Sequence, residues 1–173
     1  MWIYEKKLQY PVKIATPNAR LAGMIIDALG GPDGELGASM RYLNQRYTMP
    51  SDKVIGLLTD IGSEELGHME MVAAIVYQLT RNLTPDEIIA GGFDKYYIGH
   101  GDGIYPAAAS GEPFNATAIS SKGDAICDLN EDLAADATIL QLQPLSKKSQ
   151  KPLKYKAFSH FGKTLKNRIP AII

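Results

Sequence analysis

The sequence predicts an all-α protein folded as a helical bundle. Apolar residues recur at helical spacing along three segments, no two segments alternate as paired β-strands would, and the chain contains no internal repeat. With 173 residues and 45% apolar content, the chain suits one compact domain with a buried core.

The chain is expected to begin with an extended arm and a short helix. Pro11 and Pro17 disfavour helix over residues 1–16. From Pro17 to Leu29 apolar residues return at helical spacing, and the Gly30-Gly31 pair supplies a C-terminal stop.

Two longer helices are predicted next. Pro32 suits the first turn of a helix that runs to about Tyr47, where Met49-Pro50 breaks it. Ser51 is a good N-cap for the longest helix, predicted from Asp52 to Thr80. The stripe on one face of this helix comprises Val54, Leu57, Leu58, Ile61, Glu65, His68, Met69, Val72, Ile75, Val76 and Leu79. Two polar residues therefore lie inside an apolar stripe.

A short capped helix and a long loop separate these helices from the next. The string Thr84-Pro85-Asp86-Glu87 caps the short helix, and a Gly- and Tyr-rich loop follows over residues 91–106. The loop is long enough for a functional or oligomer contact. We interpret Tyr96, Tyr97 and Tyr105 as loop packing or subunit contacts, and His100, between glycines, as exposed.

A third long helix is predicted from Asp124 to Gln143, before Pro144. Its apolar face would carry Ile126, Leu129, Leu133, Asp136 and Leu140. The acids off that face, Asp128, Glu131 and Asp132, are expected to be solvated. Cys127 is expected to be a small packed residue and not a nucleophile.

The distribution of charge divides the chain near residue 143. All 19 acidic residues lie at or before Asp136, against ten basic ones, so this part carries a net charge of about −9. The remaining eight basic residues crowd into residues 144–173. We therefore expect a domain over 1–143 and a basic, divergent C-terminal tail over 144–173, without the aromatic interleaving of a nucleic-acid surface.

The compartment is expected to be the cytoplasm. A single cysteine excludes an internal disulfide framework, and the start, MWIYEKKLQYPVK, lacks the apolar run of a signal peptide. No apolar stretch approaches the roughly 20 residues of a transmembrane helix.

The acid and imidazole in the long stripe point to a metal. Glu65 and His68 lie three residues apart on a helix, so they share a face with the apolar Ile61 and Val72. A buried carboxylate must find a basic residue, a shared proton or a cation, and the stripe contains no basic residue. An inward Glu-x-x-His pair, with single glutamates from neighbouring helices, is typical of two-metal bundles.

Glu35 and Asp136 are candidate acids on the neighbouring helices. Glu35 lies near the start of the second helix, on a face with Ala38, Ser39 and Tyr42. Oxygen ligands with one imidazole favour manganese or iron over thiolate-bound zinc or copper. A Glu-x-x-His pair by itself is weak evidence, since most such pairs are solvated or ion-paired.

Four strings resemble the manganese catalase family, which is ferritin-like, and more narrowly its short spore-coat branch. They are KLQYPVKI (7–14), GGPDGELGASMRYLNQRY (30–47), LLTDIGSEELGHMEM (57–71) and SKGDAICDLNEDLAA (121–135). The resemblance implies that Glu35, Glu65 and His68 bind the first manganese, that Glu65 bridges to the second, and that Tyr42 is a phenol just outside the ligands.

The resemblance also implies a function. It is the disproportionation of hydrogen peroxide by a non-haem enzyme with two manganese ions, iron being the alternative metal. A homo-oligomer, spore-coat protein partners and a place in the spore coat are expected with it. Two alternatives stay open: a structural coat-assembly protein that keeps the fold without turnover, and a ferritin-like carrier of iron or manganese.

The C-terminal part departs from the family pattern. The run AADATIL places Asp136 where the family has a glutamate ligand, and its side chain is one methylene shorter. A second Glu-x-x-His motif is absent after Glu65; His160 is the nearest candidate, but Ala157 stands three residues before it. We expect a fourth helix that is incomplete or altered, and we hypothesise a reading-frame change or truncation after Asp136.

Overall fold

The computed structural model describes residues 3–97 and 103–141, the last six of these as backbone only. The helices are α1 (Ala19–Ile25), α2 (Asp27–Gly30), α3 (Glu35–Gln45), α4 (Asp52–Thr80), α5 (Pro85–Ala90) and α6 (Ala125–Gln141), with 3-10 turns η1 (Arg46–Thr48), η2 (Asp94–Tyr96) and η4 (Ala116–Ala118). In these two ranges the only β-type pairings are isolated bridges, Tyr97–Ile104 and Ala107–Pro113. The all-α prediction is therefore confirmed.

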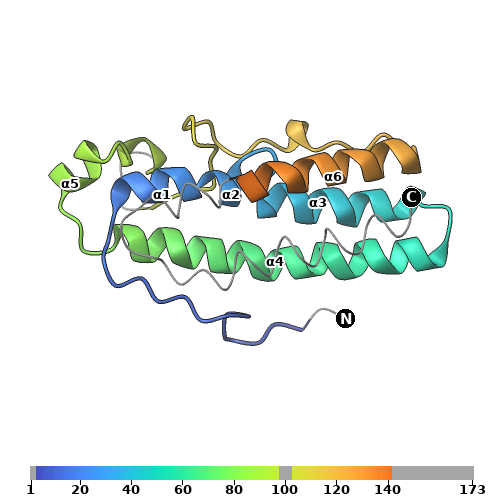
Figure 1. Ribbon diagram of the computed structural model, residues 1–173, viewed down its shortest axis with the longest axis horizontal. Helices are drawn as coiled ribbons and strands as arrows, with labels where there is room; N and C mark the ends of the chain where they lie inside the picture. The colour runs from blue at the N-terminus through green and yellow to red at the C-terminus, as the bar shows by residue number, and fades with distance from the viewer. Residues whose placement is uncertain (1–2, 98–102, 142–173) are drawn as a thin grey trace.

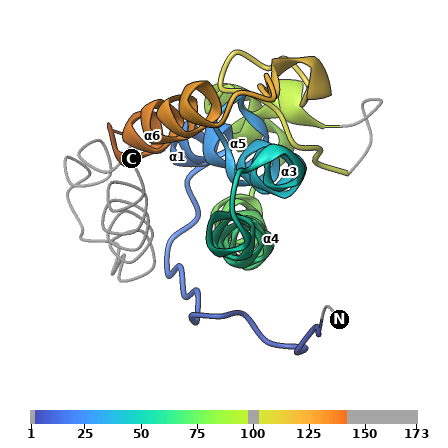
Figure 2. The ribbon, with the colours of Figure 1, turned by 90° about the vertical axis from the view of Figure 1, so that its right-hand side faces the viewer.

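The long helix α4 is the axis of the molecule. Figure 1 shows α1, α2 and α3 following one another along one side of α4, with α6 beside α3. Seen end-on, α3 lies beside α4 (Figure 2), and it packs against both α4 and α6. The short link between α3 and α4 makes them antiparallel neighbours. The N-terminal arm, residues 3–16, is extended as predicted.

The first two predicted helices differ from the structure at their junction. The helix expected from Pro17 to Leu29 is split into α1 and α2 at Ile26, and the next helix begins at Glu35 rather than at Pro32. The backbone of Gly31 and Gly34 turns back on Asp27, where a β-carbon would lie 2.5 and 2.7 Å from Asp27 oxygens. This close approach keeps residues 31–34 in a tight turn, so the helix cannot begin there.

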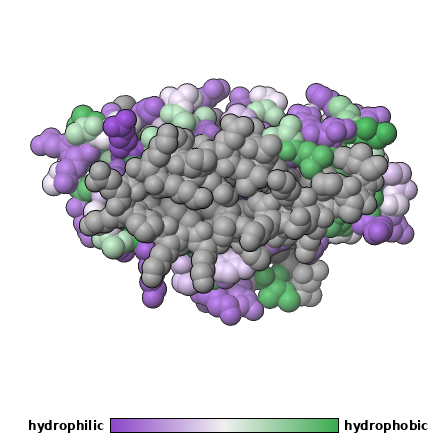
Figure 3. All heavy atoms as spheres, viewed as in Figure 1, coloured by the Kyte–Doolittle hydropathy of each residue, from purple (hydrophilic) through white to green (hydrophobic). Residues whose placement is uncertain are grey.

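The predicted caps of α4 and α5 are confirmed. The Ser51 hydroxyl accepts a hydrogen bond from the Val54 amide at the start of α4. At α5 the Thr84 hydroxyl accepts from the Glu87 amide while the Glu87 carboxylate accepts from the Thr84 amide, a reciprocal capping box. The surface around α5 is largely hydrophilic (Figure 3).

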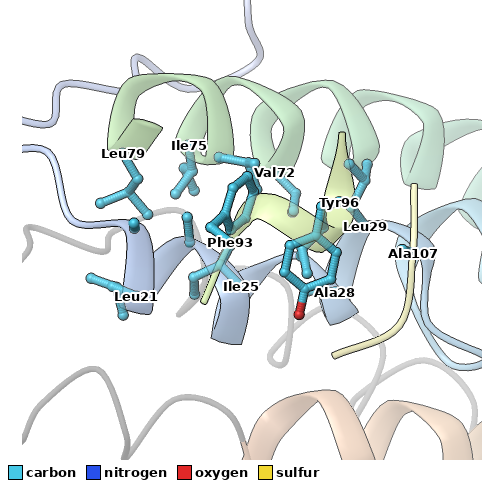
Figure 4. Close-up of a cluster of buried hydrophobic side chains, with 14 of the residues drawn as sticks. Leu21, Ile25, Ala28, Leu29, Val72, Ile75, Leu79, Phe93, Tyr96 and Ala107 are labelled. Atoms are coloured by element: carbon cyan, nitrogen blue, oxygen red, sulfur yellow. The ribbon is translucent and has the colours of Figure 1, made fainter. Parts of the chain in front are cut away.

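Two apolar clusters form the core. The larger packs α1 and α2 against the second half of α4 and the loop that follows α5 (Figure 4). Phe93 and Tyr96 are fully buried there, and the Tyr96 hydroxyl donates to the Ala109 carbonyl, so Tyr96 is loop packing as predicted. The smaller cluster joins α3, the first half of α4 and α6. His100 lies outside the described residues.

The predicted face of α6 is wrong. Asp128 and Asp132 are completely buried, whereas Ile126 is 69% exposed and Cys127 is also exposed. The reason is the loop before the helix, because both oxygens of Asp128 accept hydrogen bonds from the amides of Lys122 and Gly123. With Asp128 held inward, α6 buries a different face from the predicted one, although Leu129 is buried as expected.

Several sequence predictions fall outside the described residues. They are the side chain of Asp136, the position of His160, the proposed fourth helix and the tail over 144–173. Among the helices that the structure does describe, each is too short or too polar to cross a bilayer.

The contact between α3 and α4 depends on Gly62. A β-carbon at this position would lie 2.8 Å from Leu43 Cγ and 3.1 Å from Tyr42 Cβ, whereas one at Gly56 would meet nothing within 4 Å. Ser39 also donates to the Gly62 carbonyl at 2.7 Å. The missing side chain therefore allows the two helices to approach closely.

We predict opposite effects for alanine at these two glycines of α4. Gly62→Ala should lower the free energy of unfolding by about 1 kcal/mol or more, because overpacking outweighs the gain in helix propensity. Gly56→Ala, the control, should raise it by about 0.5–1 kcal/mol. Urea denaturation followed by circular dichroism measures both, and equal changes would contradict the packing argument.

Candidate metal centre

Three side chains that can bind a metal come together between α3 and α4. Glu35, Glu65 and His68 each offer one ligand atom, and these atoms all lie within 4.8 Å of one another. The three residues are almost completely buried, at 5%, 1% and 2% exposure. Glu35 comes from the first turn of α3, and the Glu-x-x-His pair comes from the middle of α4.

The turn before α3 places Glu35 at the centre. Gly34 is the extended N-cap, so Glu35 is the first helical residue and projects from the helix end. Arg41, one and a half turns further on, donates through Nη2 to the Pro32 carbonyl at 3.1 Å and approaches the Asp33 carboxylate at 3.4 Å. Arg41 thus ties the turn to the helix that carries Glu35.

The Glu-x-x-His pair lies where the two apolar clusters meet along α4. Ile61 belongs to the smaller cluster, and Met71 and Val72 belong to the larger one. The packing on both sides carries Glu65 and His68 into the interior, as their place in the stripe predicted. The burial is therefore imposed by the neighbours of the pair and not by its own chemistry.

The two carboxylates and the imidazole are electrostatically coupled. Nδ1 of His68 lies 2.7 Å from Glu65 Oε2 and 3.8 Å from Glu35 Oε2. Burial raises the pKa of the Glu35 carboxyl well above its usual range, the charge of Glu65 and a hydrogen bond with it raise the pKa further, and His68 opposes this. Two acids in one dry site favour a proton or a cation between them.

The donor set suits a hard or borderline divalent ion. Two carboxylates with one imidazole match the ligands that manganese(II) and iron(II) take, and no thiol is present among the three. Tyr42 is completely buried on the face of α3 that carries Glu35, Ala38 and Ser39, as the sequence predicted. Its role beside the metal stays a prediction, as do the ligand roles of Asp136 and His160.

Sequence reasoning missed a second buried polar group, which lies between α3 and α6. It consists of Arg41 and Gln45 from α3 with Asp128 and Asp132 from α6, at 0–2% exposure. Within the described residues, Nε and Nη1 of Arg41 and both Asp132 oxygens make no well-formed hydrogen bond. The sequence does contain a signal for this group. Arg41 and Gln45 are four residues apart, as are Asp128 and Asp132, so the members of each pair share a helical face.

Proteins of one known family resemble this chain in sequence and in fold. The family described as manganese-containing catalase matches residues 1–144. Protein CotJC of Bacillus subtilis (strain 168) is 55% identical over 136 residues, covering 79% of this chain and 71% of CotJC. A probable manganese catalase of Clostridium acetobutylicum is 33% identical over 138 residues, covering 79% of this chain and 61% of that protein.

A solved structure agrees with the fold. The crystal structure of KatB, a manganese catalase from Anabaena PCC7120, aligns with a TM-score of 0.83 at 24% identity, covering 99% of this chain and 77% of KatB. This likeness confirms the ferritin-like fold. The chain spans less than two thirds of the Clostridium protein and 55% of a Bacillus subtilis manganese catalase.

The buried acid Asp132 should make stability depend on pH. Its pKa is raised to about 7 from 3.8, first by burial, while Gln45 and Arg41 act in the opposite direction. At a pH between these two pKa values, Asp132 is protonated in the folded state but ionised in the unfolded chain. The free energy of unfolding should therefore fall as the pH rises from about 4 to about 7 and level off above.

Asp132→Asn should remove this dependence. The variant should match the wild type near pH 4 and exceed its free energy of unfolding at pH 8 by on the order of 1–3 kcal/mol, because it buries no charge. Urea titrations at both pH values measure the difference. Asp86→Asn, at an exposed position of α5, is the control, and an Asp132→Asn variant with unchanged pH dependence would contradict the assignment.

Proposed function

The chain belongs to the manganese-containing catalase family, and from this and the buried acid–imidazole site we propose that it binds manganese and disproportionates hydrogen peroxide. In that reaction one peroxide is reduced to two molecules of water while another is oxidised to dioxygen. The observation that carries the proposal is the convergence of Glu35, Glu65 and His68 within 4.8 Å in a buried site between two packed helices.

The positions of the three residues support the following roles. Glu35 and Glu65 would supply negative oxygen ligands, and His68 would supply Nδ1, the ring nitrogen that faces both acids. The family resemblance implies that Glu65 would also serve a second ion. A pair of bound manganese ions would supply the two-electron redox chemistry, because each ion would exchange one electron between its +2 and +3 states.

The protein around the ligands would keep the site rigid and dry. Tight packing at Gly62 and the Ser39 hydrogen bond fix the separation of α3 and α4, and hence the distance between Glu35 and the other two ligands. Tyr42, buried on the same face as Glu35, would offer a phenol near the reacting oxygens. The apolar clusters on either side would exclude water.

The second ion would need further ligands. Asp136 on α6 and His160 in the tail are the proposed donors, with the shorter Asp136 side chain as the weakness of that half of the site. Iron is the alternative metal. The similarity to CotJC supports a place in the spore coat among other coat proteins, and a homo-oligomer is proposed with it.

The proposal is tested on the full chain produced with manganese in the medium. We expect bound manganese by elemental analysis and oxygen release when peroxide is added. Glu65→Gln, which preserves shape, and His68→Ala should each lose most of the metal and lower oxygen release by at least about 100-fold, because each removes a ligand. Glu70→Gln, an acid elsewhere on α4, is the control and should behave like the wild type.

The other outcomes separate the alternative functions. Wild-type protein that folds but holds no metal and releases no oxygen would overturn the catalase proposal and favour the structural coat role. Bound iron or manganese without oxygen release would indicate a carrier. Circular dichroism of each variant shows whether a loss of metal reflects unfolding.

A further inference from the structure

We propose that Glu64 is a positioning residue that orients the His68 imidazole for metal binding, and that Gln9 of the N-terminal arm holds Glu64 in turn. The inference rests on the proposed function. It starts from the other side of the imidazole, where Nε2 of His68 lies 3.7 Å from Glu64 Oε1. The two residues are four apart on α4, so their side chains lie over one another on one helix face.

The chemistry of a histidine ligand explains why a carboxylate is useful there. A neutral imidazole carries one proton, so a ring that binds metal through Nδ1 must carry its proton on Nε2. An acid beside that N–H accepts its hydrogen bond, fixes the tautomer and the ring angle, and makes the ligand nitrogen more basic. Nδ1 of His68 faces Glu65 and Glu35, so Nδ1 is the nitrogen that would bind a metal there, and Nε2 would then hold the proton.

The burial of the two side chains fits this division of roles. The His68 side chain is 3% exposed, whereas that of Glu64 is 23% exposed and so keeps some freedom to move. At 3.7 Å the pair is slightly longer than a hydrogen bond. When Nδ1 binds a metal, it carries no proton. The ring proton then lies on Nε2, and the Glu64 carboxylate becomes the acceptor of the hydrogen bond from Nε2.

The N-terminal arm reaches the same acid. The Gln9 side-chain amide donates to Glu64 Oε1 at 3.5 Å. The side-chain oxygen of Gln9 lies close to Gly67, where an added β-carbon would be 3.3 Å from it. The arm is also tied to α4 where the Tyr4 hydroxyl donates to Glu70 at 2.7 Å and where the Ile14 amide donates to Gln78 at 2.8 Å. Figure 1 shows the arm running beside α4. Arm, acid and imidazole thus form one connected series.

The first test is the affinity of the full chain for Mn²⁺, measured by competition with a fluorescent chelator. Glu64→Gln should weaken binding by about 10-fold or more, the usual effect of removing the partner of a histidine ligand. Glu70→Gln is the matched control, because it removes the same charge from the same helix and also contacts the arm. The control should change the affinity less than about 2-fold, and Gln9→Ala should weaken binding less than Glu64→Gln does.

A second readout separates positioning from a general structural role. Electron spin echo spectra of bound Mn²⁺ report the quadrupole coupling of the remote imidazole nitrogen, which depends on the hydrogen bond at that nitrogen. This coupling should differ between the wild type and Glu64→Gln, and should be unchanged in Glu70→Gln. A loss of packing alone would lower stability without moving the coupling.

The outcomes keep this inference distinct from the proposed function. Wild-type affinity in Glu64→Gln, with metal lost in Glu65→Gln and His68→Ala, would overturn the role of Glu64 and leave the metal site intact. Equal weakening in Glu64→Gln and Glu70→Gln would also overturn it, since general charge would then be the cause. Binding unaffected by any of these variants would instead remove the metal site itself.

Discussion

The confinement of two carboxylates and an imidazole in one dry site is the constraint on which the rest of the structure depends. Glu35 and Glu65 lie close enough that each disfavours the charge of the other, and the apolar residues around them prevent water from relieving it. Such an arrangement is costly unless a cation or protons neutralise it. The fold tolerates it because the packing of α3 on α4 is fixed elsewhere, at Gly62 and Ser39.

The division of the core follows from the same constraint. A continuous apolar stripe along α4 would form one cluster, but Glu65 and His68 interrupt it, and the buried side chains separate into two groups. The site therefore lies between two well-packed regions. The smaller cluster packs α3 and α6 against the first half of α4, and the larger packs α1 and α2 against its second half, so the two ligands on α4 are held from both ends.

The sequence predicted those features that depend on residues close together in the chain. The stripe of α4 led to Glu65 and His68, and the caps at Ser51 and Thr84 are as expected, because helical spacing and capping are local properties. The face of α6 was wrong because Asp128 is satisfied by loop amides, a contact made only in the folded chain. The burial of Arg41 was missed for the same kind of reason.

The packing of α3 against both α4 and α6 has a consequence for how this protein can change over evolutionary time. Seven of its 11 residues are buried. Glu35 and Tyr42 lie against α4, whereas Arg41 and Gln45 lie near Asp132 of α6. Because one short helix makes both contacts, a substitution that improves the packing against α4 also shifts the packing against α6, and the reverse holds. Few substitutions in α3 should therefore be neutral. Neutral substitutions should be tolerated mainly in α5 and on the outer side of α4.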